Sequence, residues 1–423
     1  MAEIQPLRAL RYDPSAAGSL EAVIAPPYDV IDDVLRADLL AKSPFNVVEV
    51  DLPKAPDGGD PYRHAGEVFE AWCGQGVLVR DQEPAFWALE QRYAAPDTSE
   101  RRRRGFFARV RVEDYGPGRI RPHERTHPGP KEDRLRLTHA TRANLSPIFS
   151  LFADPWGASG EVFEGATAGA PFASAADHEG TRNDLWQIVG SEPVAALQSA
   201  LAGAELLIAD GHHRYETARV YADEVGGEGE HRYALMFLCS LSDPGLTVFP
   251  THRLLTGLKD APAKQEAIRE AVLRDFDVEQ VSRDELEPSG EDPGRVQLGY
   301  MDSFQAKPYR LTLKDPEIAA GAMPEMPEPY RRLDTAVLEA IVLKGALGMS
   351  DDDISHLRGL AYSKSFDDAR EAVESGRADA GFFMGATPVE QVREVAEAGV
   401  SMPPKSTYFY PKVPTGLVFN VLE

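Results

Sequence analysis

The feature that most constrains the fold of this chain is a short apolar segment that ends abruptly in a polar turn. Residues 206–209 are apolar and have strand character, Asp210 and Gly211 interrupt them, and helical character runs from His212 through Tyr221. Glycine permits the sharp turn because its backbone adopts positive φ at little steric cost. A strand, a tight turn and a helix in this order predict a protein in which strands and helices alternate.

Helix and strand signals alternate along the rest of the chain, and several strands follow one another directly. Period-two patterns and short apolar runs predict strands at 7–12, 45–52, 85–93, 105–112, 148–152, 233–240, 246–249, 296–300, 309–313, 380–385 and 404–412. Helical periodicity and capping residues predict helices at 32–40, 62–73, 132–143, 184–201, 261–275, 334–347, 366–374 and 388–398. We therefore predict an α/β fold, with α+β as the alternative, in which several layers surround a mixed parallel and antiparallel sheet.

The length of 423 residues predicts two or three domains. We expect a main α/β domain at 1–255, a variable module and linker at 256–330, and a C-terminal α/β subdomain at 331–423. Prolines and glycines at 316–329 predict the linker, and polar residues at 96–104 predict a hairpin loop with a solvated arginine run. Thr387 and Glu390 predict a capping box at the start of a late helix.

The net charge of −23 argues against binding to nucleic acid and to anionic membrane surfaces. No apolar run approaches the ~18 residues of a membrane span, and no leader-like segment begins the chain, so we expect a cytoplasmic protein. The two cysteines, Cys73 and Cys239, are expected to be buried and unpaired. Because the chain is acidic, an anionic ligand requires a local group of cations.

The turn that follows residues 206–209 supplies such a group. Backbone N–H groups at a helix start point outward without partners, and the helix dipole adds positive character. Gly211 allows close approach of a ligand, while His212, His213 and Arg214 add polar and cationic side chains. We predict that this turn is the functional site.

A second polar region, residues 122–134, contains His123, Glu124, Arg125 and Lys131. Three prolines and a glycine prevent regular structure at its centre, so these side chains are expected on a constrained loop, where functional groups often occur. Asp29, at the end of an extended double-proline segment, is a further candidate for lining a pocket.

The turn is compatible with three kinds of site. In phosphoryl transfer, helix amides and Arg214 hold phosphate oxygens while an acidic residue positions the acceptor or Mg²⁺. In metal-assisted hydrolysis, Asp210 and the two histidines bind a divalent ion with His123 or His127. In the third, the histidines are structural. Adjacent histidines point to different sides, which argues against one shared metal, and the sequence contains neither a phosphate loop nor a nucleophile elbow.

Several segments resemble one family across nearly the whole chain. They are Ile24-Ala25-Pro26-Pro27-Tyr28-Asp29-Val30, residues 46–48, 122–134 and 143–147, Asp210-Gly211-His212-His213-Arg214-Tyr215, Pro250-Thr251-His252-Arg253, and residues 403–412. On these segments the chain is identified as a member of the bacterial and archaeal family called domain of unknown function 1015. The resemblance implies no particular activity.

A local resemblance extends further. The Asp210–Arg214 turn is similar to the phosphate-contacting turn of free serine kinases and of the ParB and sulfiredoxin nucleotide-binding fold, except that Thr217 stands where the ParB motif has alanine. It implies a phosphotransferase that uses ATP or ADP with Mg²⁺ and acts on a small hydroxyl compound, serine being one candidate. The alternatives are a metal-dependent phosphohydrolase and a non-catalytic nucleotide sensor.

The residues implied for that activity fall into two groups. Gly211, His212, His213 and Arg214, with Arg125 and Lys131, would bind the nucleotide, and no protein-held metal is expected. Asp210 or Glu124 would accept the hydroxyl proton, with His123 as a further catalytic residue. The expected partners are the nucleotide and the small substrate, and a homodimer is left open.

Overall fold

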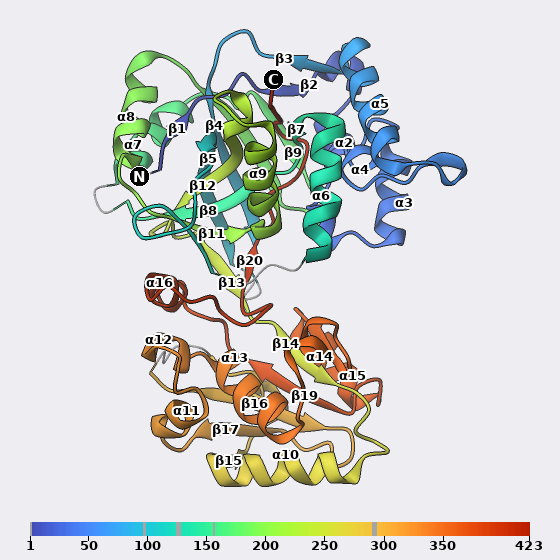
Figure 1. Cartoon of the computed structure of the whole chain (residues 1–423), viewed down its shortest axis with the longest axis vertical. Coiled ribbons are helices and arrows are strands. Elements are labelled where there is room, and N and C mark those ends of the chain that lie inside the picture. The colour runs from blue at the N-terminus through green and yellow to red at the C-terminus, as the bar shows by residue number, and fades with distance from the viewer. Residues whose placement is uncertain (1, 96–98, 124–127, 155–156, 290–293) are drawn as a thin grey trace. The chain divides into compact units, whose positions relative to one another are not determined.

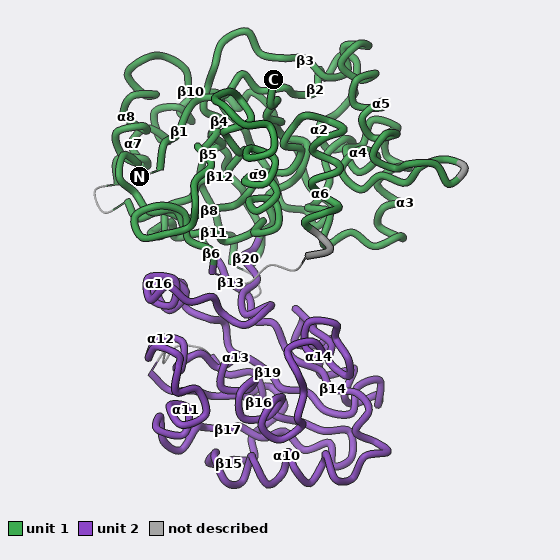
Figure 2. The backbone as a smooth tube through the Cα atoms, viewed as in Figure 1, with its two compact units in different colours: residues 1–122, 126–246, 411–423 green, residues 123–125, 247–410 purple. Residues whose placement is uncertain are grey.

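The computed structural model describes residues 2–95, 99–123, 128–154, 157–289 and 294–423 (Figure 1). They form two compact units, coloured separately in Figure 2: unit 1 from 1–122, 126–246 and 411–423, and unit 2 from 123–125 and 247–410. This division differs from the three predicted segments. Strands from 256–330 and from 331–410 share one sheet, and residues 411–423 belong to unit 1.

Unit 1 is built on a nine-stranded sheet with the order β6-β11-β8-β12-β5-β4-β10-β9, and β1 pairs with β5. The strands are β1 (Ile4–Gln5), β4 (Phe86–Ala94), β5 (Glu100–Arg111), β6 (Ile120–Pro122), β8 (Ile148–Phe152), β9 (Ala173–Ala176), β10 (Arg182–Ile188), β11 (Leu206–Asp210) and β12 (Tyr233–Ser240). β6 is parallel to β11 and β8 to β12, whereas the other neighbours are antiparallel. This confirms the predicted mixed α/β sheet.

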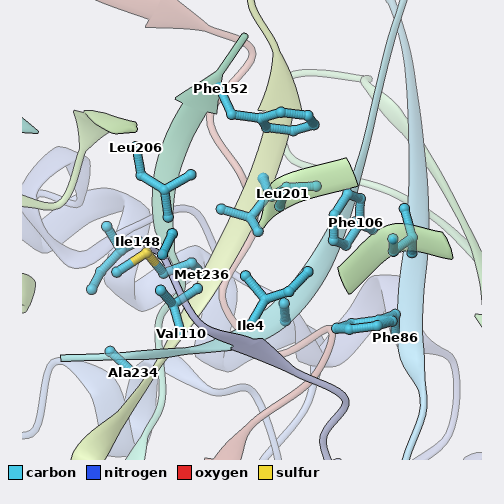
Figure 3. Packing of buried hydrophobic residues seen from close by; sticks show 14 of the residues in the cluster. Ile4, Phe86, Phe106, Val110, Ile148, Phe152, Leu201, Leu206, Ala234 and Met236 are labelled. Carbon is cyan, nitrogen blue, oxygen red and sulfur yellow. The ribbon is translucent and has the colours of Figure 1, made fainter. Parts of the chain in front are cut away.

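One face of this sheet carries a large apolar core (Figure 3). Phe86, Phe106, Ile148 and Met236 pack there with residues of α7 (Ala158–Ala166) and α8 (Ser191–Leu201). Because successive strand residues point to opposite faces, the neighbours of Phe106 in β5 lie on the other face of the sheet. Arg103 of β5 lies on that second face, where its guanidinium packs over the rings of Phe149 and Phe237.

Helices α9 (His212–Val225), α6 (Pro128–Thr141) and α5 (Pro61–Gly74) pack in succession beside the sheet, α6 contacting both of the others (Figure 1). A second core joins α5 to the N-terminal elements and to Phe419 near the C-terminus. The C-terminal strand β21 (Asn420–Val421) pairs with β7 (Ala143–Asn144), which anchors the end of the chain in unit 1. The N-terminal elements are β2 (Leu10–Tyr12), α1 (Pro14–Ala17), α2 (Leu20–Val23), η1 (Tyr28–Val30), α3 (Asp33–Lys42), α4 (Val48–Asp51), η2 (Pro56–Gly58) and β3 (Leu78–Arg80).

Unit 2 contains a six-stranded antiparallel sheet with the order β15-β17-β16-β19-β14-β18. Its strands are β14 (His252–Leu255), β15 (Phe276–Gln280), β16 (Gln297–Asp302), β17 (Tyr309–Leu313), β18 (Leu360–Ser363) and β19 (Ala380–Met384). Separately, β13 (Thr247–Phe249) pairs with β20 (Tyr408–Tyr410). The helices are α10 (Pro262–Asp275), α11 (Pro316–Ala322), α12 (Glu328–Arg331), α13 (Asp334–Val337), the π-helix η5 (Leu338–Ala346), α14 (Asp351–Ser355), α15 (Phe366–Glu374) and α16 (Val389–Glu397), with short 3-10 turns η3 (Glu230–Arg232, in unit 1) and η4 (Arg283–Glu285).

The strand predicted at 45–52 is wrong, because this segment contains the short helix α4. The Asn46 side chain accounts for the difference. Its Nδ2 donates to the carbonyls of Ala22 and Ile24 at 2.9 and 3.0 Å, and its Oδ1 accepts from the Val48 N–H at 3.1 Å. These bonds hold the backbone in a turn that competes with extended structure.

The hairpin loop predicted at 96–104 is wrong from Glu100 onward, because the arginine run lies in β5. Arg103 is fully buried, at 0% exposure, whereas Arg102 is exposed. A strand sends alternate side chains to opposite faces, so a uniform run of arginines is divided between different environments.

Four further local predictions are wrong. Residues 184–188 belong to β10, which bonds to strands on both sides, and only α8 is helical in 184–201. The predicted linker contains α11, which Asp315 caps, and α12. Thr387 forms no capping box, because its hydroxyl donates to the Ser406 carbonyl at 3.3 Å and Pro388 is the N-cap. Cys73 is exposed, while Cys239 is buried as predicted.

The other predicted helices and most other predicted strands are present with shifted ends, and Asp32 caps α3 through the Leu35 N–H at 2.8 Å. None of the helices in the described part of the chain is long and apolar enough to cross a membrane.

Candidate functional site

The predicted strand–turn–helix unit is confirmed as β11, Gly211 and α9. Gly211 is the N-cap of α9 and has φ 94° and ψ 29°, in the left-handed region. A Cβ atom at this position would lie 3.0 Å from the guanidinium carbon of Arg214. Both the conformation and the close contact explain why the turn requires glycine. Because Gly211 has no side chain, this N-cap residue makes no side-chain hydrogen bond to α9.

Asp210 holds two cationic side chains at this turn. One carboxylate oxygen accepts a hydrogen bond from Arg214 Nη2, and the other lies 2.7 Å from Lys412 Nζ. The three side chains are largely buried: Asp210, Arg214 and Lys412 are 16%, 10% and 11% exposed. Arg214 also donates to the carbonyl of Pro147.

The electrostatics of Asp210 follow from this arrangement. Burial raises the pKa of the carboxyl, but the charges of Lys412 and Arg214 outweigh burial and hold the pKa well below its usual range. Asp210 is therefore ionised at neutral pH, and it is a weak proton acceptor in this state.

Lys412 is a candidate site residue that the sequence analysis missed. It lies 202 positions from Asp210 and reaches the site because the backbone around it is fixed to the sheet. Arg103 Nη2 donates to the Pro411 carbonyl at 2.5 Å, and Gln91 Nε2 donates to the Lys412 carbonyl at 3.2 Å. The only sequence signal for Lys412 was its place in the family-like segment 403–412.

Arg103 itself is held without a carboxylate partner among the described residues. Its Nε donates to Gln91 Oε1 at 3.1 Å, and its guanidinium lies 4.5 Å from the centre of the Phe149 ring. Burial lowers the pKa of Arg103. These contacts make Arg103 a buried support for the segment that carries Lys412.

A second buried ion pair lies next to Arg214. Arg134 pairs with Asp51 at 3.3 Å, and its guanidinium lies 3.9 Å from the centre of the Tyr28 ring. Burial raises the pKa of Asp51 and raises the pKa of Tyr28 to about 12. Arg214 and Arg134 line a common cavity of about 40 Å³, a volume that would fit only a few water molecules and is too small for a nucleotide.

The constrained loop predicted at 122–134 is wrong from Pro128 onward, because α6 begins there and Lys131 lies in this helix; prolines are tolerated in the first turn, where the N–H groups have no helical partner. Two segments from this region lie beside the turn. β6 pairs with β11, and α6 packs against α9, where the Thr217 hydroxyl donates to the Lys131 carbonyl at 3.4 Å. Glu124 and Arg125 lie outside the described residues, as does His127. Within the helix start, His212 is buried and His213 is half-buried.

His123 belongs to unit 2 and is almost fully buried there. Its Nε2 lies 2.7 Å from Thr407 Oγ1, its carbonyl accepts from the Met402 N–H at 2.7 Å, and its ring packs edge-on against Phe409. Asp29 is exposed and lies within electrostatic range of Arg214. Among the described residues, no group of three or more His, Cys, Asp or Glu side chains could hold a metal ion.

The sequence model of the family described as "Protein of unknown function (DUF1015)" matches residues 4–336. No curated protein matches the sequence at a significant level. Similar solved structures include a conserved hypothetical protein from Pyrococcus furiosus, at 17% identity and a TM-score of 0.37, covering 71% of this chain and 90% of that chain. A free serine kinase in complex with AMP has 15% identity and a TM-score of 0.37, covering 70% of this chain and 88% of that chain. SbnI with a C-terminal truncation, from Staphylococcus aureus, has 10% identity and a TM-score of 0.38, and the match covers 74% of this chain and 87% of that chain. At these TM-scores the likeness does not establish a shared function.

Proposed function

The chain belongs to the DUF1015 family of proteins of unknown function, and from that premise we propose that the Asp210 turn binds nucleotide phosphates. The proposed activity is phosphoryl transfer between ATP or ADP and a small hydroxyl compound, for which serine is one candidate. One observation carries the proposal: a buried carboxylate at the start of α9 is shared by two cations, Arg214 and Lys412.

This arrangement suits an exchange of anions. A phosphate group carries more negative charge than one carboxylate, and helix N–H groups and two cations are strong donors to its oxygens. When a nucleotide binds, Arg214 and Lys412 would donate hydrogen bonds to its phosphate oxygens in place of some of their hydrogen bonds to Asp210. Gly211 allows the phosphate to approach the backbone of His212 and His213. Because the present cavity is small, the proposal requires side chains to move when the nucleotide enters.

The proposed role of Asp210 follows from its surroundings. Asp210, with its lowered pKa, is better suited to positioning the two cations than to accepting a proton. Glu124 is therefore the proposed base, with His123 as the alternative, and Arg125 and Lys131 are proposed as further phosphate contacts. Mg²⁺ would neutralise charge on the nucleotide phosphates.

Binding of Mg²⁺-ADP to the full chain, measured by calorimetry, tests the site. We expect Lys412→Met and Arg214→Met to weaken binding at least about tenfold, since each removes a charge-assisted bond. Lys54→Met is the matched control, because Lys54 is 57% exposed and pairs with Asp33 at the surface. Unchanged ADP affinity in both site variants, with the fold intact, would refute the phosphate site.

Turnover separates the proposed activity from its rivals. Incubation of the protein with Mg²⁺-ATP or Mg²⁺-ADP and a panel of hydroxyl compounds should give a phosphorylated acceptor. Release of inorganic phosphate without an acceptor would indicate a phosphohydrolase. Binding with no turnover for any acceptor would indicate a nucleotide sensor.

A further inference from the structure

Unit 2 contains a cavity of about 420 Å³ between α10 and the face of the sheet formed by β15, β16 and β17. This volume lies in the range of small-molecule sites, which are typically about 300–1,000 Å³. Ile268 and Val272 of α10 and Leu311 of β17 form apolar walls, and Tyr300 and Tyr309 add aromatic rings.

Three exposed apolar side chains are among the residues that line this cavity. Leu273, Val278 and Phe304 line it, and they are 51%, 40% and 44% exposed. Nine large apolar side chains in the described part of the chain are exposed, and three of the nine line this one cavity. A cluster of exposed apolar side chains is typical of a ligand-binding groove or another interaction site.

One buried carboxylate in the cavity lining, that of Asp302, forms no ion pair with any residue that the structure describes. Asp302 is 8% exposed, and its Oδ1 accepts from the N–H groups of Phe304 and Gln305 at 3.0 and 2.7 Å. Its Oδ2 accepts from the Tyr300 hydroxyl at 3.1 Å. No basic side chain in the described ranges forms an ion pair with Asp302. In contrast, Glu266 on the same lining pairs with Arg269 at 2.8 Å.

We propose that this cavity binds a small organic cation, namely an ammonium compound with an aromatic or aliphatic body. Its ammonium group would lie at Asp302 beside the tyrosine rings, which attract cations through their faces. Its hydrocarbon part would pack against Ile268, Val272 and Leu311. The proposal concerns a site in unit 2 and does not depend on the nucleotide site of unit 1.

The test uses three probes of nearly equal size with the full chain. Calorimetry and ligand-observed NMR would compare 2-phenylethylamine, which is protonated at pH 7, with neutral 2-phenylethanol and anionic phenylacetate. We expect the amine to bind at least about tenfold more tightly than the alcohol, the factor for one charge-assisted hydrogen bond, and phenylacetate to bind least. Equal affinities for the three probes, or no binding by any of them, would overturn the proposal, and this result requires only the wild-type protein.

Variants then locate the site. Asp302→Asn keeps the size of the side chain and removes its charge, so the affinity for the amine should fall to that for the alcohol. Val272→Trp fills the cavity and should abolish binding of both compounds. Glu266→Gln is the control, because its carboxylate is already paired, and it should leave binding unchanged. Full amine binding in both Asp302→Asn and Val272→Trp would place the compound elsewhere and contradict the assignment.

Discussion

Replacement of Asp210 by asparagine tests the electrostatic structure of the turn. The substitution keeps the size of the side chain but leaves two buried cations, Arg214 and Lys412, without their shared carboxylate. Removal of one partner from a buried ion pair typically costs about 3–5 kcal/mol. Because these side chains are 10–16% exposed, we expect the lower end, about 3 kcal/mol.

Urea denaturation followed by tryptophan fluorescence measures this loss in unit 1. The tryptophans that the structure describes, Trp72, Trp87 and Trp186, belong to unit 1. At a typical urea dependence of about 1–3 kcal/mol per molar, the midpoint should fall by about 1 M or more. Asp114→Asn is the matched control: this aspartate is 79% exposed and pairs with Arg219, so its loss should cost less than about 1 kcal/mol.

The pH dependence gives an independent readout of the same contact. The folded-state pKa of Asp210 is lowered relative to the unfolded value of about 3.9. Its contribution to the free energy of unfolding is therefore complete above that value and is lost as the pH falls through the folded pKa. The difference in stability between wild type and Asp210→Asn should narrow below about pH 4. Equal stability of the two proteins at pH 7, or a difference that widens in acid, would refute the reasoning.

Two further predictions concern the supports of the turn. Gly211→Ala places a Cβ atom at positive φ and 3.0 Å from the Arg214 guanidinium, so unit 1 should lose about 1–2 kcal/mol in the urea assay. Gly74→Ala, where the added Cβ would meet no atom within 4 Å, should cost nothing, and equal losses in the two variants would contradict the explanation. Arg103→Lys cannot reproduce the planar contacts to Gln91 and Pro411, so it should destabilise unit 1 by about 1–3 kcal/mol and weaken ADP binding through Lys412. Arg102→Lys, at the exposed neighbouring position, should change neither quantity, and normal ADP binding by a folded Arg103→Lys protein would show that Lys412 does not depend on this support.

Those parts of the fold whose causes lie within a few residues could be predicted from the sequence. The change from β11 to α9 is signalled by an apolar run, a glycine and a helical pattern that are contiguous in the chain. The cap that Asp32 provides for α3 has the same local origin. Where Asn46 bonds to carbonyls more than twenty positions earlier, the local pattern at 45–52 predicted the wrong structure.

The candidate site likewise contains features with local causes in the sequence and features that depend on distant segments. That Asp210, Gly211 and Arg214 share a turn at a helix start could be predicted from the local pattern, because adjacent residues on a strand–turn–helix unit have little freedom to separate. In contrast, the pairing of Lys412 with Asp210 across 202 positions and the burial of Arg103 within an arginine run result from tertiary packing. These contacts depend on which strands neighbour β5 and on where the C-terminal segment packs. Side-chain burial and charge pairing between distant segments arise only once the sheet has assembled, so no local pattern encodes them.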